Sequence, residues 1–289
     1  MRTRKVIGVV GICVAAIVVV VVVVRLSPGH MPQTPASVPA LVTRECTDLA
    51  TTSLKARAEV TDDGGEWITR RAFQYLEGDE EDFPEIIPLV NASFEYGNPP
   101  TGWSYRDSVH ASRVRDPVKV GSYALRYDYP ADAGYGFART ALFDRIEWAG
   151  KSITIGAWVK TDIGDSVRIE CMEWGGAWRK WAWSSRHPGD GEWHFLVGTG
   201  TVPTDLTHDF AIIVSNKVQS EDVTFYVDGF VAAEGLELKL VFEDGEFATG
   251  EYSLPISGLE PDTSYRIRAL VENGGGIGCG NVVTCQTLQ

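Results

Sequence analysis

Short runs of alternating apolar and polar residues, bounded by Gly, Asp, Asn and Pro, fill most of the chain from Thr43 onward. A period of two predicts β-strands with one buried face, and almost no segment has the spacing of an amphipathic helix. About eleven such runs are too many for one small sandwich. A length of 289 residues matches two domains of ordinary size. The sequence therefore predicts an all-β fold with two sandwiches.

The N-terminal end predicts a membrane span. Residues 6–24 are uncharged and lie between Lys5 and Arg25, and about 20 apolar residues are enough to cross a bilayer as a helix. More basic residues precede this segment than follow it, which predicts a cytoplasmic tail at residues 1–5 and an extracellular remainder. A cleaved signal peptide, which would make the protein secreted, is the alternative. Prolines at near-regular spacing in residues 25–42 predict an extended linker.

The charge and the motifs of the chain limit its function. Lys and Arg number 26 against 39 Asp and Glu, which gives a formal net charge of -13 at pH 7. A protein this acidic lacks the broad basic face that binds nucleic acid, so we expect no nucleic-acid partner. The five histidines show no metal-ligand spacing, and the sequence contains neither a glycine-rich phosphate loop nor a G-x-S-x-G motif. We therefore expect a protein that is not an enzyme.

The most specific local pattern is Gly258–Ala269, which reads GLEPDTSYRIRA. It resembles the corner between strands E and F of fibronectin type III domains, in which the tyrosine, here Tyr265, bonds to upstream backbone. Residues 43–79 resemble the first three strands of the same family, with an Asp-Asp-Gly-Gly hairpin turn. Together the two parts have the length of one such domain. The resemblance implies a discontinuous fibronectin III-like sandwich made of residues 43–83 and 237–289.

Residues 84–236 would then form a second domain inserted into the first. Short motifs in this segment resemble, in their order, the jelly-roll carbohydrate-binding modules found beside xylanases and glucanases. The resemblance implies an inserted jelly-roll β-sandwich that binds polysaccharide or glycan. A laminin-G-like module would share the sandwich and shift the expected ligand toward protein or glycan. The motifs are Leu89–Glu95, Gly102-Trp103, Val120–Arg126, Ile153–Lys160, Glu192–His194 and Phe225–Gly229.

The same resemblance implies a structural calcium ion near the junction of the first and last strands of the inserted domain. The matching residues are Glu95 and Asp228, with main-chain carbonyls from Lys119 to Ser122 as further ligands. Oxygen atoms brought together from distant segments are the ligands that Ca²⁺ binds in proteins. The alternative is that Glu95 caps a turn and Asp228 is a solvated turn residue.

Exposed aromatic rings are the candidate sugar-binding residues, because pyranose rings stack on Trp and Tyr while polar groups bond the sugar hydroxyls. Four tryptophans lie in the segment EWGGAWRKWAWSS. Alternation predicts that Trp181 and Trp183 share one strand face and pack in the core. The candidate ligand-binding residues are Trp174 and Trp178 beside two glycines, Tyr135 in a predicted loop, and Trp103.

The five cysteines allow at most two disulfides. Outside the cytoplasm, Cys46 has two possible partners, Cys279 and Cys285, and the sequence does not choose between them.

Together these features predict a membrane-anchored extracellular protein that binds glycan through the inserted domain. The alternative is a structural or adhesive subunit of a cell-surface appendage or virion, in which the sandwiches self-associate. A glycan-binding protein requires a groove with exposed rings and polar groups, whereas a structural subunit requires an apolar patch or a free strand edge.

Overall fold

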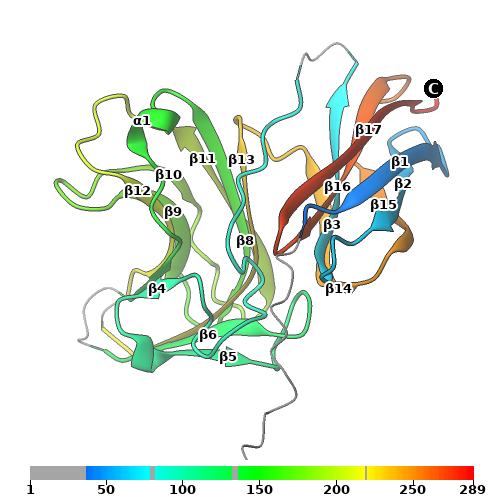
Figure 1. The fold of residues 1–289 in the computed structure, drawn as a ribbon. Coiled ribbons are helices and arrows are strands. Elements are labelled where there is room, and N and C mark those ends of the chain that lie inside the picture. Colours follow the sequence, from blue (N-terminus) through cyan, green and yellow to red (C-terminus); the bar gives the residue numbers. More distant parts are fainter. Residues whose placement is uncertain (1–36, 79–81, 132–135, 219) are drawn as a thin grey trace, which may run out of the picture. The chain divides into compact units, whose positions relative to one another are not determined.

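The computed structural model describes residues 37–78, 82–131, 136–218 and 220–289, which form an all-β fold (Figure 1). Two short helical turns interrupt the strands: η1 (Ser108–His110) and α1 (Arg145–Trp148). The predicted membrane span, residues 6–24, lies outside the described residues. None of the helices in the described ranges is long and apolar enough to cross a membrane.

Strands from the two ends of the chain form a pair of sheets with one shared core. Their buried side chains, among them Leu54, Phe73 and Ile267, belong to a single hydrophobic cluster. Strand β1 begins at Ala40, so the predicted end of the linker at residue 42 is wrong. The sheet order β1-β2-β15 joins β1 (Ala40–Thr47), β2 (Ser53–Asp62) and β15 (Gly250–Ser257). The order β14-β3-β16-β17 joins β14 (Leu240–Phe247), β3 (Ile68–Glu77), β16 (Ser264–Asn273) and β17 (Gly276–Gln286).

The corner before β16 has the hydrogen bond expected from the sequence. The hydroxyl of Tyr265 accepts the main-chain N–H of Glu260 at 2.8 Å. Leu259 is buried in the core of the same sheet pair. The corner therefore ties the loop that leads into β16 to the ring that begins the strand.

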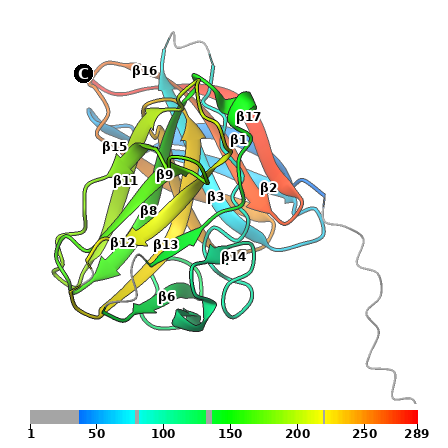
Figure 2. The same cartoon turned by 90° about the vertical axis from the view of Figure 1, so that its left-hand side faces the viewer.

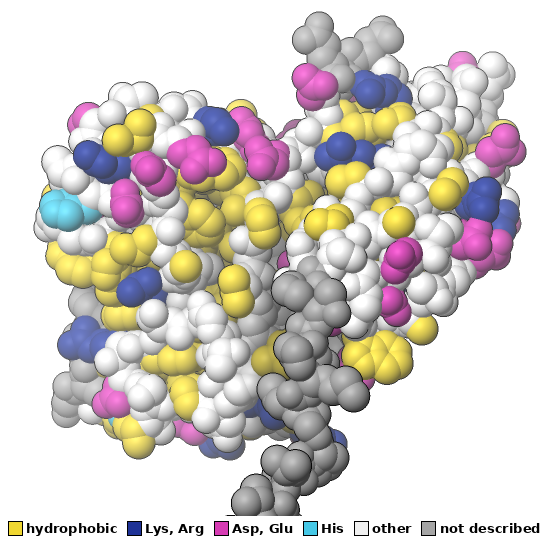
Figure 3. Space-filling model, viewed as in Figure 1, with side chains coloured by type: hydrophobic (Ala, Val, Ile, Leu, Met, Phe, Trp, Pro, Cys, Tyr) yellow, Lys and Arg dark blue, Asp and Glu magenta, His cyan; other side chains and the backbone are white. Residues whose placement is uncertain are grey.

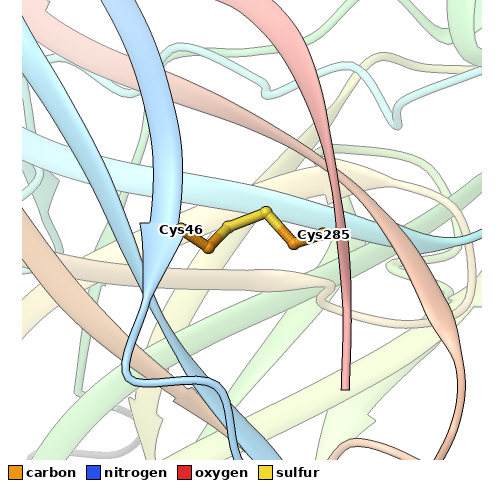
Figure 4. Close-up of a disulfide and its surroundings, with 2 residues drawn as sticks. All are labelled: Cys46 and Cys285. Atoms are coloured by element: carbon orange, nitrogen blue, oxygen red, sulfur yellow. A yellow bond between two sulfur atoms is a disulfide. The ribbon is translucent and has the colours of Figure 1, made fainter. Parts of the chain in front are cut away.

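A disulfide joins the first and last strands of this sheet pair (Figure 4). Cys46 on β1 is bonded to Cys285 on β17, with their Cα atoms 6.2 Å apart. This pairing settles the choice that the sequence left open. The remaining described cysteines are free: Cys171 is buried and Cys279 is exposed.

The middle of the chain forms one curved sheet whose inner face encloses its own core. Buried residues of β9 and β13 belong to the same hydrophobic cluster although three strands separate them in the sheet, so the sheet folds back on itself as a sandwich. Figure 2 shows β8, β9 and β12 in front. The sheet order is β4 (Ser104–Tyr105), β7 (Phe137–Arg139), β12 (Phe210–Asn216), β9 (Val167–Glu173), β10 (Lys180–Ser184), β11 (Trp193–Thr201), β8 (Ser152–Thr161), β13 (Val223–Glu234), β6 (Ala124–Tyr129) and β5 (Ala111–Val114).

A third, smaller cluster connects the two cores. It contains Ala72 of β3, Leu240 of β14 and Val231 of β13, with Phe195 of β11 packed against it. Beside it lies a buried charge network. Both oxygens of Asp244 accept hydrogen bonds from the guanidinium of Arg70, which also donates to the main-chain oxygen of Phe230 at 2.7 Å.

The Arg70 guanidinium is held charged by its partners. Burial by itself would lower the pKa of Arg70, but the carboxylates of Asp244, Glu272 and Asp228 raise it above its usual value. A guanidinium with two carboxylate bonds and one carbonyl bond is well compensated for its loss of water. Removing it would leave the Asp244 carboxylate buried without its main partner.

We expect Arg70→Leu to lower the free energy of unfolding by about 3–5 kcal/mol, because one partner of a buried ion pair is left uncompensated. Arg57→Leu is the matched control, since its ion pair with Glu251 is exposed and should contribute less than about 1 kcal/mol. Urea denaturation measures both values. Equal losses in the two variants would contradict the assigned role of Arg70.

Candidate functional site

A groove of about 420 Å³ lies on the outer face of the curved sheet, over β7, β9 and β12. Its position follows from strand alternation. Ile169 and Cys171 of β9 point into the core, so Glu170 and Met172 point outward. Figure 3 shows hydrophobic side chains gathered on this sandwich among charged ones. The groove is lined by Arg106, Phe137, Glu170, Met172, Trp174, Trp178, Lys180, Ile213, Ser215 and Lys217.

Aromatic rings form one end of the groove. The rings of Trp174 and Trp178 are nearly perpendicular, with centroids 4.9 Å apart, and Phe137 meets Trp174 edge to face at 5.1 Å. The ring of Trp178 is 48% exposed. Because Gly175 and Gly176 adopt positive φ, the chain turns sharply after β9 and brings Trp178 back beside Trp174. These rings offer two differently oriented apolar surfaces to a ligand.

Glu173, the last residue of β9, anchors the start of the loop that carries the tryptophans. Its side chain is almost fully buried, and Oε1 accepts the N–H and the hydroxyl of Thr207 and the N–H of His208. The guanidinium of Arg139 lies 4.4 Å from the centre of the Trp174 ring. These contacts fix the end of β9 and position the Trp174 ring that follows it.

A cluster of charged side chains forms the other end of the groove. Glu170 is 1% exposed, and its carboxylate contacts Lys217 at 2.6 Å, Lys180 at 2.9 Å and Arg168 at 2.8 Å. Burial by itself would raise the pKa of Glu170, but Lys217 and Lys180 lower it to about 2. Glu170 is therefore ionised and shared among three cationic groups. Burial lowers the pKa of Lys217 despite its contact with Glu170.

Two of the four predicted ligand-binding residues line the groove. Trp174 and Trp178 do so, as described above. Tyr135 lies outside the described residues. Trp103 is 7% exposed and packs against Phe94 and Phe230 in the core. A ring enclosed in this way has no face for a sugar, so the prediction for Trp103 is wrong.

The prediction that Trp181 and Trp183 share a core-facing side is also wrong. The pairing of β10 with β9 shifts between Lys180 and Ala182, where two residues of β10 advance against one of β9. This bulge breaks the alternation on which the prediction depended. Trp181 packs against the core, whereas Trp183 is 51% exposed.

The residues of the predicted calcium site bind main-chain amides. Oε1 of Glu95 accepts the N–H groups of Ser122 and Tyr123, and Oδ2 of Asp228 accepts those of Lys119 and Val120. The loop thus turns the positive ends of its amides toward the two carboxylates. Ca²⁺ binds oxygen atoms and is repelled by N–H groups that point at the same carboxylates. The arrangement does not fit Ca²⁺ and fits the hydrogen-bonding alternative for Glu95.

A second possible metal cluster is also engaged in hydrogen bonds. His187, Asp190 and His194 are the one group of three such side chains close enough to share an ion in the described part of the chain. However, Nδ1 of His187 accepts the N–H of Gly189, so Nε2 carries the proton and donates to the main-chain oxygen of Glu192. His187 therefore has no free lone pair for a metal.

Sequence reasoning missed the charged residues of the groove. The signal available was the alternation in RIECMEW, which puts Arg168, Glu170, Met172 and Trp174 on one face of a strand. Lys180 and Lys217 carry no such signal, because their proximity depends on the strand order β12-β9-β10.

We expect Trp103→Ala to lower the free energy of unfolding by about 3–5 kcal/mol, as large-to-small core substitutions do. Trp178→Ala and Trp183→Ala should each cost less than about 1 kcal/mol because both rings are half exposed. Chemical denaturation of the three variants checks this order. A reversed order would contradict the placement of the tryptophans.

We expect the melting temperature to be the same within about 1 °C in CaCl₂ and in chelator, because a ligand that does not bind the native state cannot stabilise it. Differential scanning calorimetry is the measurement. A rise in melting temperature with Ca²⁺ that Asp228→Asn abolishes would instead establish the calcium site.

Comparison with known proteins yields similarity only among solved structures. No protein-family description matches the chain, and no curated protein matches it. The CBM22-1 xylan-binding domain from Paenibacillus barcinonensis Xyn10C matches 55% of this chain and 100% of its own length, with 14% identity and a TM-score of 0.42.

Two further solved structures match a similar share of this chain and nearly all of their own length. TmCBM61, solved in complex with β-1,4-galactotriose, matches 52% of this chain and 97% of its own length, at 17% identity and a TM-score of 0.37. The C-terminal family 22 module of Clostridium thermocellum Xyn10B matches 53% and 99%, at 16% identity and a TM-score of 0.37. Similarities this low assign neither a family nor a ligand to this chain.

Proposed function

We propose that this protein is a non-catalytic glycan-binding protein and that the groove over β7, β9 and β12 is its binding site. The observation that carries the proposal is the pairing of Trp174 and Trp178, held at right angles in a groove of about 420 Å³ that also contains hydrogen-bonding side chains. Glycan sites combine these two features, since the C–H faces of a pyranose are apolar and its edge is polar.

The chemistry of the groove supports binding rather than hydrolysis. Glycosidases usually use two carboxyl groups, one of which must be protonated in the working enzyme. Glu170 is the one carboxylate among the groove-lining residues that the structure describes. Its contacts with three cationic side chains favour the ionised form, so it is poorly suited to act as an acid.

The remaining parts of the proposal concern architecture and location. The curved sheet would be a jelly-roll module, and the sheet pair from the two chain ends would be a fibronectin III-like domain that displays it. The 3+4 strand orders, and the bond from Glu260 to the Tyr265 hydroxyl, support the second assignment. Residues 6–24 would anchor the protein in a membrane with both sandwiches outside the cell.

We expect residues 37–289 to bind at least one glycan on an array, and Trp178→Ala to weaken that binding by roughly 1–3 kcal/mol, as the loss of one stacked ring does. Trp67→Ala is the matched control. Trp67 is 58% exposed but lies next to β3, in the sheet pair formed by the two ends of the chain and not in the curved sheet.

Binding that Trp178→Ala and Trp67→Ala reduce equally would contradict the assignment of the groove. Failure to bind any glycan, together with concentration-dependent self-association, would favour the structural-subunit alternative. Sedimentation velocity on the same samples detects that association.

A further inference from the structure

The groove has the opposite charge to the rest of the protein. The whole chain has a formal net charge of -13. Among the described residues that line the groove, Arg106, Lys180 and Lys217 are basic and only Glu170 is acidic. A basic groove in an acidic protein attracts anions locally, whereas the acidic surface around it repels them. This contrast indicates that the ligand brings negative charge.

The single carboxylate cannot neutralise the cations around it. Glu170 contacts Lys217, Lys180 and Arg168, so one negative charge faces three positive ones. The Lys180 side chain is 32% exposed and reaches the solvent in the groove. An ammonium group has three N–H donors, so Lys180 can bond to Glu170 and to a ligand together.

Arginines add positive charge beside the aromatic rings. Arg106 is exposed, and its main-chain N–H donates to the oxygen of Phe137, which places it next to the aromatic end of the groove. Arg139 lies over Trp174, and its Nε atom is buried without a hydrogen-bond partner among the described residues.

The aromatic rings and the cationic side chains lie close together along the same groove. Met172 pairs with Lys180 across β9 and β10, and Trp174 follows two residues later, roughly 7 Å along the strand direction. A glycan that stacks on Trp174 and runs along the groove would therefore pass Lys180, which lines the same groove.

We propose that the groove binds a glycan whose sugar rings carry anionic groups, either carboxylates or sulfate esters. This proposal rests on the proposed glycan-binding function and names the class of sugar. The apolar faces of the rings would stack on Trp174 and Trp178, and the anionic groups would bond to Lys180, Arg106 and the cationic cluster around Glu170.

The test compares two anionic polymers with their neutral counterparts. Polygalacturonate is paired with its fully methyl-esterified form, which has the same backbone without the charge, and dextran sulfate is paired with dextran. Isothermal titration calorimetry of residues 37–289 should give at least about a tenfold lower Kd for one anionic polymer than for its neutral partner. The polymer that binds identifies the anion. Raising the salt from about 0.05 to about 0.5 M should weaken this binding.

Variants locate the binding. We expect Arg106→Gln combined with Lys180→Gln to raise the Kd for the anionic polymer at least about tenfold. Lys55→Gln is the control. It removes one positive charge from the exposed face of β2, which belongs to the sheet pair and not to the curved sheet that carries the groove. Circular dichroism melting verifies that each variant folds, and the single Arg106→Gln variant, at an exposed position, gives the same direction if the double variant unfolds.

The contradicting results separate this proposal from the one on which it rests. If neutral and anionic polymers bind equally and Trp178→Ala abolishes both, the glycan site stands and the anionic class is wrong. If Lys55→Gln weakens binding as much as the groove variants do, the polymer is attracted by positive charge anywhere on the protein. The proposal of an anionic glycan bound in the groove is then also wrong. If neither these polymers nor any glycan on the array binds, both proposals fail.

Discussion

The pleat of strand β9 is the constraint on which both the core and the groove depend. Its alternate residues point to opposite faces, so Ile169 and Cys171 fill the core while Glu170 and Met172 form the groove floor. A register shift of one residue would expose the apolar set and bury the charged one. The free energy that stabilises the core therefore also fixes which side chains of β9 line the groove.

A chain of hydrogen bonds connects the loop between β5 and β6 to the buried ion pair. The N–H of Gly121 donates to the main-chain oxygen of Asp244, whose carboxylate holds Arg70. Gly121 has a φ of +66°, and a Cβ atom there would also lie 2.2 Å from Oε1 of Glu95, so glycine is favoured where this loop meets that carboxylate. Other N–H groups of the same loop bond to Glu95 and Asp228. The loop thus links the curved sheet to the sheet pair formed by the two ends of the chain.

The sequence predicted what depends on local pattern and missed what depends on strand order. Alternation of period two was sufficient for an all-β fold, and the glycines before Trp178 correctly indicated an exposed turn. The bulge at Trp181 leaves no mark in the pattern, so the faces of Trp181 and Trp183 were misassigned. The charged cluster joins residues of β9 and β10 and the end of β12, whose adjacency arises only when the sheet is assembled. The pairing of Cys46 with Cys285 instead of Cys279 likewise depends on how β1 and β17 come together in the folded domain.

The most direct test of the central claim is to observe the indole N–H signals of the tryptophans by ¹H–¹⁵N NMR during titration with an oligosaccharide that the protein binds. Each indole reports on its own surroundings, so the titration locates the ligand without altering the protein. The account predicts saturable shifts for Trp174 and Trp178, which line the groove, and none for the distant, exposed Trp67. Shifts at Trp67 with none at Trp174 and Trp178 would show that the ligand binds elsewhere.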